Sequence, residues 1–165
     1  MRNRTPSLLS FGLALGLLVL SIPASAAVDI VFTAVGADGN TIIGESTEPT
    51  HPDWIDVLAF SHGITVPLGS NGAPSGPAIT QQLSLTSYFD ISTTRLFQAQ
   101  SSGETLQSFT LDVVYPGAAK MPMAAIRYEM TNAHVVSTNT GMSGGEDRMT
   151  LNMSFSYAQI TITDL

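Results

Sequence analysis

The chain has 165 residues and carries 13 acidic against six basic residues, a formal net charge of −7 at neutral pH. This balance repels phosphate backbones and excludes nucleic-acid binding as the main function. The chain has no cysteine, which excludes a disulfide framework and a lipid anchor attached to an N-terminal cysteine.

Residues 1–26 are predicted to be a cleaved signal peptide. Arg2 and Arg4 precede an uncharged apolar run over 8–22, and Ala24 and Ala26 supply the small residues that a signal peptidase requires. The alternative is a retained membrane anchor, but the run is short for a bilayer core of about 30 Å. Cleavage after Ala26 leaves no membrane anchor and predicts a secreted or periplasmic protein.

The remaining residues, 27–165, are the size of one domain with a single core. Loss of Arg2 and Arg4 leaves four basic residues against 13 acids, a formal charge of −9.

Residues 28–35 predict a first strand, and the Gly- and Asn-rich stretch 36–40 predicts a turn. An acidic loop is expected over 45–53.

Residues 54–66 predict a second, long strand, and the Pro- and Gly-rich stretch 67–77 predicts a projecting loop. Apolar and polar residues alternate over 79–89, which is typical of a half-buried strand. Residues 92–100 predict one short helix, with Ser92 as the N-cap and Gly103 as the stop.

The second half continues as strands. Alternation over 108–115 predicts one strand, and residues 121–138 predict another with a kink near Asn132. In the last strand the apolar residues occupy odd positions up to Tyr157 and even positions from Ala158. A side-chain period of two changes face only at an extra residue or a bend, so a β-bulge or sharp bend is expected there.

These elements predict an all-β, mainly antiparallel fold, a β-barrel or sandwich with one short side helix. No internal repeat or linker divides residues 27–165, which are therefore predicted to be one domain.

The stretch 44–67 concentrates two histidines and several acids, which raises the question of a metal site. His51, Asp53 and His62 could contribute ligands, but His51 precedes the strand that carries His62, and zinc needs a third or fourth supported ligand. The favoured interpretation is that Glu45, Glu48 and Asp53 form a solvated acidic loop and that His62 is an ordinary strand residue.

The sequence evidence for a catalytic site is weaker than that for a metal site. Ser61 beside His62 is not a nucleophile elbow. Glu146 and Asp147 lie in a glycine-rich turn, where solvated acids are common. No catalytic, cofactor-binding or metal-binding residue is predicted, and an enzyme is not expected.

Three strands have polar faces with almost no charge, although a solvated face usually carries Lys and Glu. These faces suit a surface that meets other subunits or lines a channel, and a Ser/Thr-rich exterior of an exported protein explains them equally well. The residues are Thr80, Gln82, Ser84 and Thr86; Ser108 and Thr110; and Thr150, Asn152, Ser154 and Ser156.

Several segments, in order, resemble the haemolysin-coregulated protein (Hcp) family of the type VI secretion system. The Ile-Gly-Glu-Ser turn at 43–46 and the segment IDVLAFSHG at 55–63 fit the family at their fixed positions. The segment at 85–99 is similar, with Thr93-Thr94 in place of Ser-Pro. Weaker similarities follow at Leu111-Asp112-Val113, at 132–137 and at 150–162.

This resemblance implies an Hcp-like β-barrel with a side helix, without catalytic residues or cofactor. It implies self-association into hexameric rings that stack as a tube, and contact with effector or spike proteins. The leading hypothesis is thus a ring- or tube-forming structural subunit, a secreted conduit and effector carrier. The alternative is an exported monomeric β-barrel binding module whose loops at 45–53 and 67–77 hold a ligand.

Overall fold

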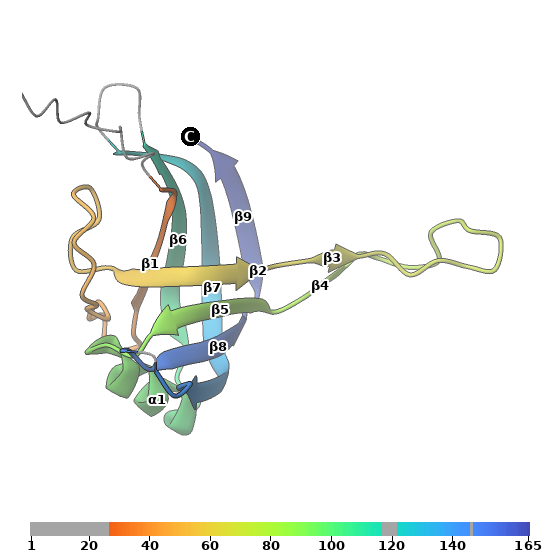
Figure 1. Cartoon of the computed structure of the whole chain (residues 1–165). Coiled ribbons are helices and arrows are strands. Elements are labelled where there is room, and N and C mark those ends of the chain that lie inside the picture. Colours follow the sequence, from red (N-terminus) through yellow and green to blue (C-terminus); the bar gives the residue numbers. More distant parts are fainter. Residues whose placement is uncertain (1–26, 117–121, 146) are drawn as a thin grey trace, which may run out of the picture.

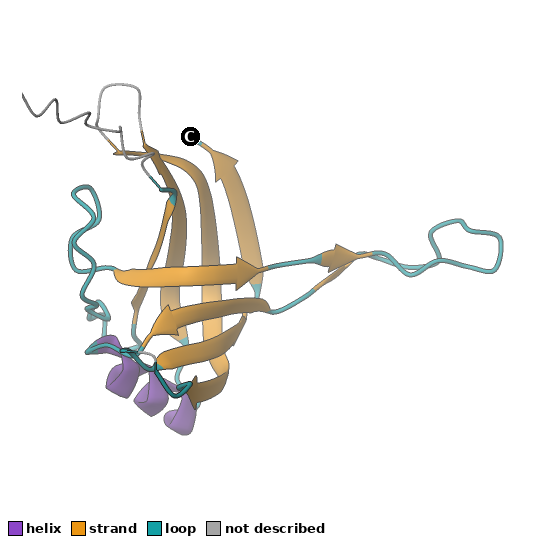
Figure 2. Ribbon diagram, in the orientation of Figure 1, coloured by secondary structure: helices purple, strands orange, loops and turns teal. Residues whose placement is uncertain are grey.

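The structure is a computed structural model that describes residues 27–116, 122–145 and 147–165. The predicted signal peptide, residues 1–26, lies outside the described residues. Strands dominate the described chain, and one helix lies at the end of the sheet (Figures 1 and 2). The elements are β1 (Asp29–Val35), β2 (Ile55–Ser61), β3 (Ile64–Thr65), β4 (Ile79–Thr80), β5 (Leu83–Tyr88), α1 (Ser92–Ser102), β6 (Leu106–Pro116), β7 (Pro122–Gly141), β8 (Thr150–Ser156) and β9 (Gln159–Asp164).

The main sheet closes on itself. Strands β6, β1, β2, β5, β8 and β7 pair in that order, and β6 also pairs with β7. All these pairings are antiparallel, and β9 adds to β7 outside the closed ring. The predicted all-β, mainly antiparallel fold with one short helix is confirmed, and closure makes it a barrel.

Alternation along the strands fills the barrel. Leu83 and Leu85 of β5 face inward with Leu151 and Phe155 of β8, and all four are buried. Phe155 packs against Phe32 and Phe109, with ring centroids 6.0 and 4.8 Å away. Because side chains alternate with period two, the polar residues between these positions must lie on the outer face of the wall.

The last two strands, β8 and β9, pair one after the other with the same long strand, β7. Strand β8 pairs with residues 134–141 of β7, and β9 pairs with residues 126–131. Between these two regions Asn132 has a positive φ of 51°. The structure confirms the predicted bend at Tyr157-Ala158 and the predicted kink near Asn132. The two lie opposite each other, so β7 bends at the same level at which β8 gives way to β9.

A two-stranded arm leaves the barrel between β2 and β5. The prediction of one strand over 54–66 is wrong, because β2 ends at Ser61 and β3 pairs only with β4, away from the barrel (Figure 1). The strand predicted over 79–89 divides in the same way. Ile79, which the alternation placed on the buried face, is 55% exposed on the arm. The predicted loop at 67–77 forms the tip.

Helix α1 covers one end of the barrel through Leu96 and Ala99 (Figure 2). The prediction of Ser92 as N-cap is wrong, because Ile91 occupies that position. Asp90 instead accepts a hydrogen bond from the Ser92 amide at 3.0 Å. Gly103 ends the helix with φ of 66°, as predicted. In the described part of the chain, no helix is long and apolar enough to cross a membrane.

Candidate functional site

A polar face covers the outer side of the barrel wall where β2, β5, β8 and β7 lie side by side. Strand register places its residues in two rows across the four strands. One row contains Ser61, Ser84, Ser154 and Ser137, and the other contains Ala59, Thr86, Asn152 and Asn139. These eight residues are called the polar face below.

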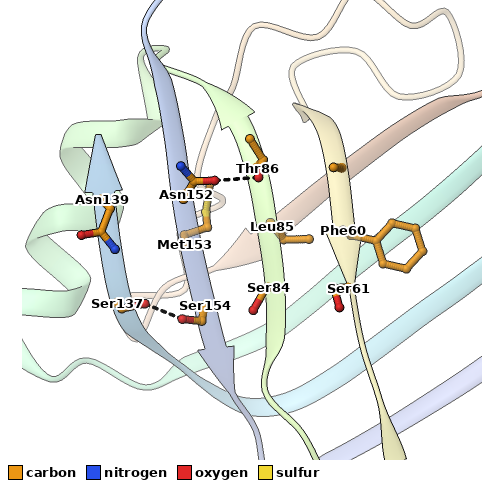
Figure 3. Close-up of a pocket in the computed structure, with 11 residues that line it drawn as sticks. Phe60, Ser61, Ser84, Leu85, Thr86, Ser137, Asn139, Asn152, Met153 and Ser154 are labelled. Atoms are coloured by element: carbon orange, nitrogen blue, oxygen red, sulfur yellow. Dashed lines mark hydrogen bonds between the residues drawn. The ribbon is translucent and has the colours of Figure 1, made fainter. Parts of the chain in front are cut away.

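The polar face is slightly hollowed, with a volume of about 250 Å³ (Figure 3). Thr86 Oγ1 donates a hydrogen bond to Asn152 Oδ1 at 2.7 Å, and the Ser137 and Ser154 hydroxyls bond to each other. None of the residues that line the hollow is charged. The surface therefore presents hydroxyl and amide groups that can donate or accept hydrogen bonds, and it has no charged group that would hold an ion of opposite sign.

The polar face collects only part of the predicted charge-poor residues. Ser84, Thr86, Asn152 and Ser154 lie in it, and β7 adds Ser137 and Asn139, which the strand pattern did not single out. Thr80 lies on the arm in β4, while Ser108 and Thr110 lie on β6. The sequence indicated the residue type correctly, but strand order decided which residues meet.

Backbone hydrogen bonds join the beginning and the end of the acidic loop at 45–53. The Gly44 amide donates to the Asp53 carbonyl and the Ser46 amide donates to the Trp54 carbonyl, both at 2.8 Å. A Cβ on Gly44 would lie 2.3 Å from the Trp54 carbonyl oxygen, so only glycine allows this approach.

The loop places His51 in a buried polar network. Its Nδ1 lies 2.7 Å from Glu48 Oε2, and its Nε2 lies 2.8 Å from Asp112 Oδ2. Arg127 donates to both oxygens of Asp112, at 2.8 and 2.7 Å. The prediction that Glu48 belongs to a solvated loop is wrong, because Glu48 and Asp112 are 7% and 0% exposed. The network ties the loop to β6 and β7.

Hydrogen bonding favours the charged forms of Glu48 and Arg127 in this network. Burial raises the pKa of the Glu48 carboxyl, but hydrogen bonds from Thr50 and His51 outweigh burial and hold the pKa below its ordinary value. The Glu48 contribution to stability is thus complete above the ordinary glutamate pKa and is lost as the pH falls through the lowered one. Pairing with Asp112 raises the pKa of Arg127, which stays charged.

The candidate metal residues do not converge. His51 is committed to two carboxylates, and His62 Nε2 lies 2.7 Å from the Tyr157 hydroxyl at the root of the arm. Within the described ranges no group of three or more metal-binding side chains could hold an ion. Glu146 lies outside the described residues.

Comparison with known proteins identifies the family. The model of the family described as type VI secretion system effector, Hcp, matches residues 33–163. The chain belongs to the Hcp family. It is 37% identical over 122 residues to protein hcp1 of Pseudomonas aeruginosa, covering 72% of this chain and 75% of that protein.

Solved Hcp structures share the fold. A double mutant of Hcp1 from E. coli EAEC 042 has a TM-score of 0.78 at 23% identity, covering 84% of this chain and 92% of its own. Secreted protein Hcp3 from Pseudomonas aeruginosa has a TM-score of 0.67 at 19% identity, covering 82% and 91%. The Hcp-like barrel predicted from the motifs is confirmed.

Family membership supports the predicted tube subunit of the type VI secretion system, a structural role, and no observation favours the alternative of a monomeric binding module. The network of Glu48, His51, Asp112 and Arg127 was not predicted from the sequence. One signal was available: Asp112 stands between the apolar residues Leu111 and Val113 in a strand whose other polar residues are uncharged.

Proposed function

We propose that this Hcp-family chain is exported, assembles as a closed, hexameric ring that stacks into a tube, and carries effector proteins in a structural rather than catalytic role. The observation that carries this proposal is the polar face. A solvated wall would be expected to carry Lys and Glu, whereas this one carries neutral hydroxyls and amides across four strands. Such a surface suits the lining of a conduit, because cargo can pass without being held by fixed charges.

The arm supports self-association. It exposes Ile64, Val66, Leu68 and Ile79 by 43–65%, and no charged residue occurs between His62 and Gln82. A two-stranded hairpin is marginally stable alone in water, so an apolar arm needs a surface to pack on. A neighbouring copy of the chain supplies such a surface in a ring, where each subunit can give its arm to the next.

The first expected result is that the mature protein runs as a closed oligomer that persists or strengthens as salt is raised. Each subunit carries a formal charge of −9, so subunits repel one another, and salt screens this repulsion over a Debye length of about 10 Å at 0.1 M. Apolar contacts of the arm do not weaken under the same conditions. Light scattering across a salt series measures the mass.

Variants of the arm separate assembly from folding. The double variant Ile64→Ser and Leu68→Ser should run as a monomer with an unchanged barrel, whereas Met142→Ser, at a residue equally exposed elsewhere, should leave the oligomer intact. A monomeric mass for the parent at every salt and protein concentration would refute the ring.

Thiol labelling tests whether the polar face lines the interior. The chain has no cysteine, so Ser154→Cys and, as a control, Ser101→Cys on the exposed side of α1 introduce single thiols. We expect a bulky maleimide to label Ser154→Cys slowly in the oligomer and rapidly in the monomeric arm variant. Equal rates in both forms would place this face on the outside.

Export predicts the mature N-terminus. We expect secreted or periplasmic material to begin at Ala27, since Ala24 and Ala26 fit the peptidase and the run before them is short for a membrane anchor. Intact-mass measurement decides the point. Recovery of the uncleaved chain alone, in membranes, would contradict it.

A further inference from the structure

The arm leaves the barrel through two junctions that lie side by side. His62 and Gly63 join β2 to β3, and Gln81 and Gln82 join β4 to β5. The Gln81 amide donates a hydrogen bond to the Gly63 carbonyl at 2.8 Å. Among the described residues, β3 and β4 pair only with each other, so the direction of the arm depends on these two junctions (Figure 1).

The hydroxyl of Tyr157 contacts both junctions. It donates a hydrogen bond to the Gln81 carbonyl at 2.8 Å, and it lies 2.7 Å from His62 Nε2. A carbonyl can only accept, so the hydroxyl proton points to Gln81 and the hydroxyl oxygen accepts a hydrogen bond from an N–H at His62 Nε2. One side-chain atom thus bonds both the junction that enters the arm and the junction that leaves it.

Tyr157 itself is held by the barrel. It stands between the end of β8 at Ser156 and the start of β9 at Gln159, where these two strands pass along β7. Its ring lies near the His62 ring, with centroids 6.0 Å apart, and it packs against the hydrophobic core. The bend between β8 and β9 therefore determines where the hydroxyl lies, and through the hydroxyl it determines where the arm begins.

We propose that Tyr157 is a positioning residue for assembly, whose hydroxyl latches the two junctions and holds the arm in the direction in which a neighbouring subunit receives it. This inference rests on the ring proposed above. An arm that pivots freely points in the required direction for only a fraction of the time, and the apparent affinity between subunits falls by that fraction. Holding the arm before contact lowers the ordering cost of association.

Four single substitutions separate the hydroxyl of Tyr157 from the packing of its ring. Tyr157→Phe keeps the ring and removes both hydrogen bonds. His62→Leu removes the donor of one bond, whereas His62→Gln restores it, because the amide nitrogen of glutamine can donate in place of Nε2. Tyr128→Phe is the matched control, since the Tyr128 ring lies 6.2 Å from that of His62 and its hydroxyl takes no part in the latch.

Hydrogen exchange of the Gln81 amide reports on the latch without a ring. In the arm variant Ile64→Ser and Leu68→Ser, which is designed to be monomeric, we expect Tyr157→Phe to speed this exchange about tenfold, as for the loss of about one net hydrogen bond. His62→Leu should also speed it, whereas His62→Gln and Tyr128→Phe should stay near the starting rate. Amides in the β5–β8 ladder should exchange as before in all four variants.

Light scattering then measures assembly in the chain with an unchanged arm. We expect Tyr157→Phe to form the oligomer only at a protein concentration at least about tenfold higher than the parent needs, and Tyr128→Phe to match the parent. Unchanged Gln81 exchange in Tyr157→Phe, or equal acceleration in the β5–β8 ladder, would overturn the latch. Faster exchange with unchanged assembly would overturn its role in assembly. A parent that stays monomeric would refute the ring and that role with it, whereas the exchange rates would still decide the latch.

Discussion

Phe155→Asp is expected to abolish folding. Phe155 is fully buried, opposes Leu83 across the β5–β8 ladder and packs against Phe32 and Phe109. Loss of a buried phenylalanine costs about 3–5 kcal/mol, and an unpaired buried carboxylate adds several more. Domain stability is about 5–15 kcal/mol, so the sum removes most or all of it. Thermal unfolding of the purified variant is the measurement.

Neighbouring positions on the same strand provide controls for Phe155→Asp. Leu151→Asp should fail in the same way, because Leu151 is also 0% exposed. Asn152→Asp places the same carboxylate on the outer face and should melt near the parent. If Phe155→Asp melted near the parent while Asn152→Asp did not, the two faces of β8 would be reversed.

The barrel was predictable because it is encoded locally. Alternation over 79–89 and 149–157 placed the central apolar residues of β5 and β8 on the inner face correctly, although Ile79, Phe89 and Met149 at the ends are exposed. The change of parity at Tyr157-Ala158 located the bend that lets β8 and β9 follow β7. These signals need only the side-chain period of a strand. Strand order was not available in this way, so the polar face could not be assembled from its separate strands.

The arm and the buried network were missed for a different reason. Residues 54–66 have strand propensity throughout, and propensity does not record that pairing partners change after Ser61. His51 and Asp112 are 61 positions apart, and only the folded loop brings them to 2.8 Å. An acidic loop is usually solvated, so without that contact the sequence favoured the wrong environment for Glu48.

Asp112→Ala is the second change with a large expected effect. Asp112 is fully buried and holds His51 on one side and the bidentate Arg127 on the other. Removing one partner of a buried ion pair leaves the others uncompensated, which costs about 3–5 kcal/mol. We expect the urea midpoint to fall accordingly. The emission of Trp54 should also shift toward longer wavelength before global unfolding, because Trp54 packs against His51, which Asp112 holds in place.

Variants at the two partners distinguish a network from simple loss of packing at Asp112. Arg127→Met should also lower the midpoint, because it leaves the fully buried Asp112 carboxylate with His51 as its remaining partner among the described residues. The double variant Asp112→Ala with His51→Gln should lose less free energy of unfolding than the sum of the two single variants, because each single change already breaks the same contact. Strict additivity, or an Asp112→Ala midpoint equal to that of the parent, would mean that the loop is held by its backbone bonds from Gly44 and Ser46 alone.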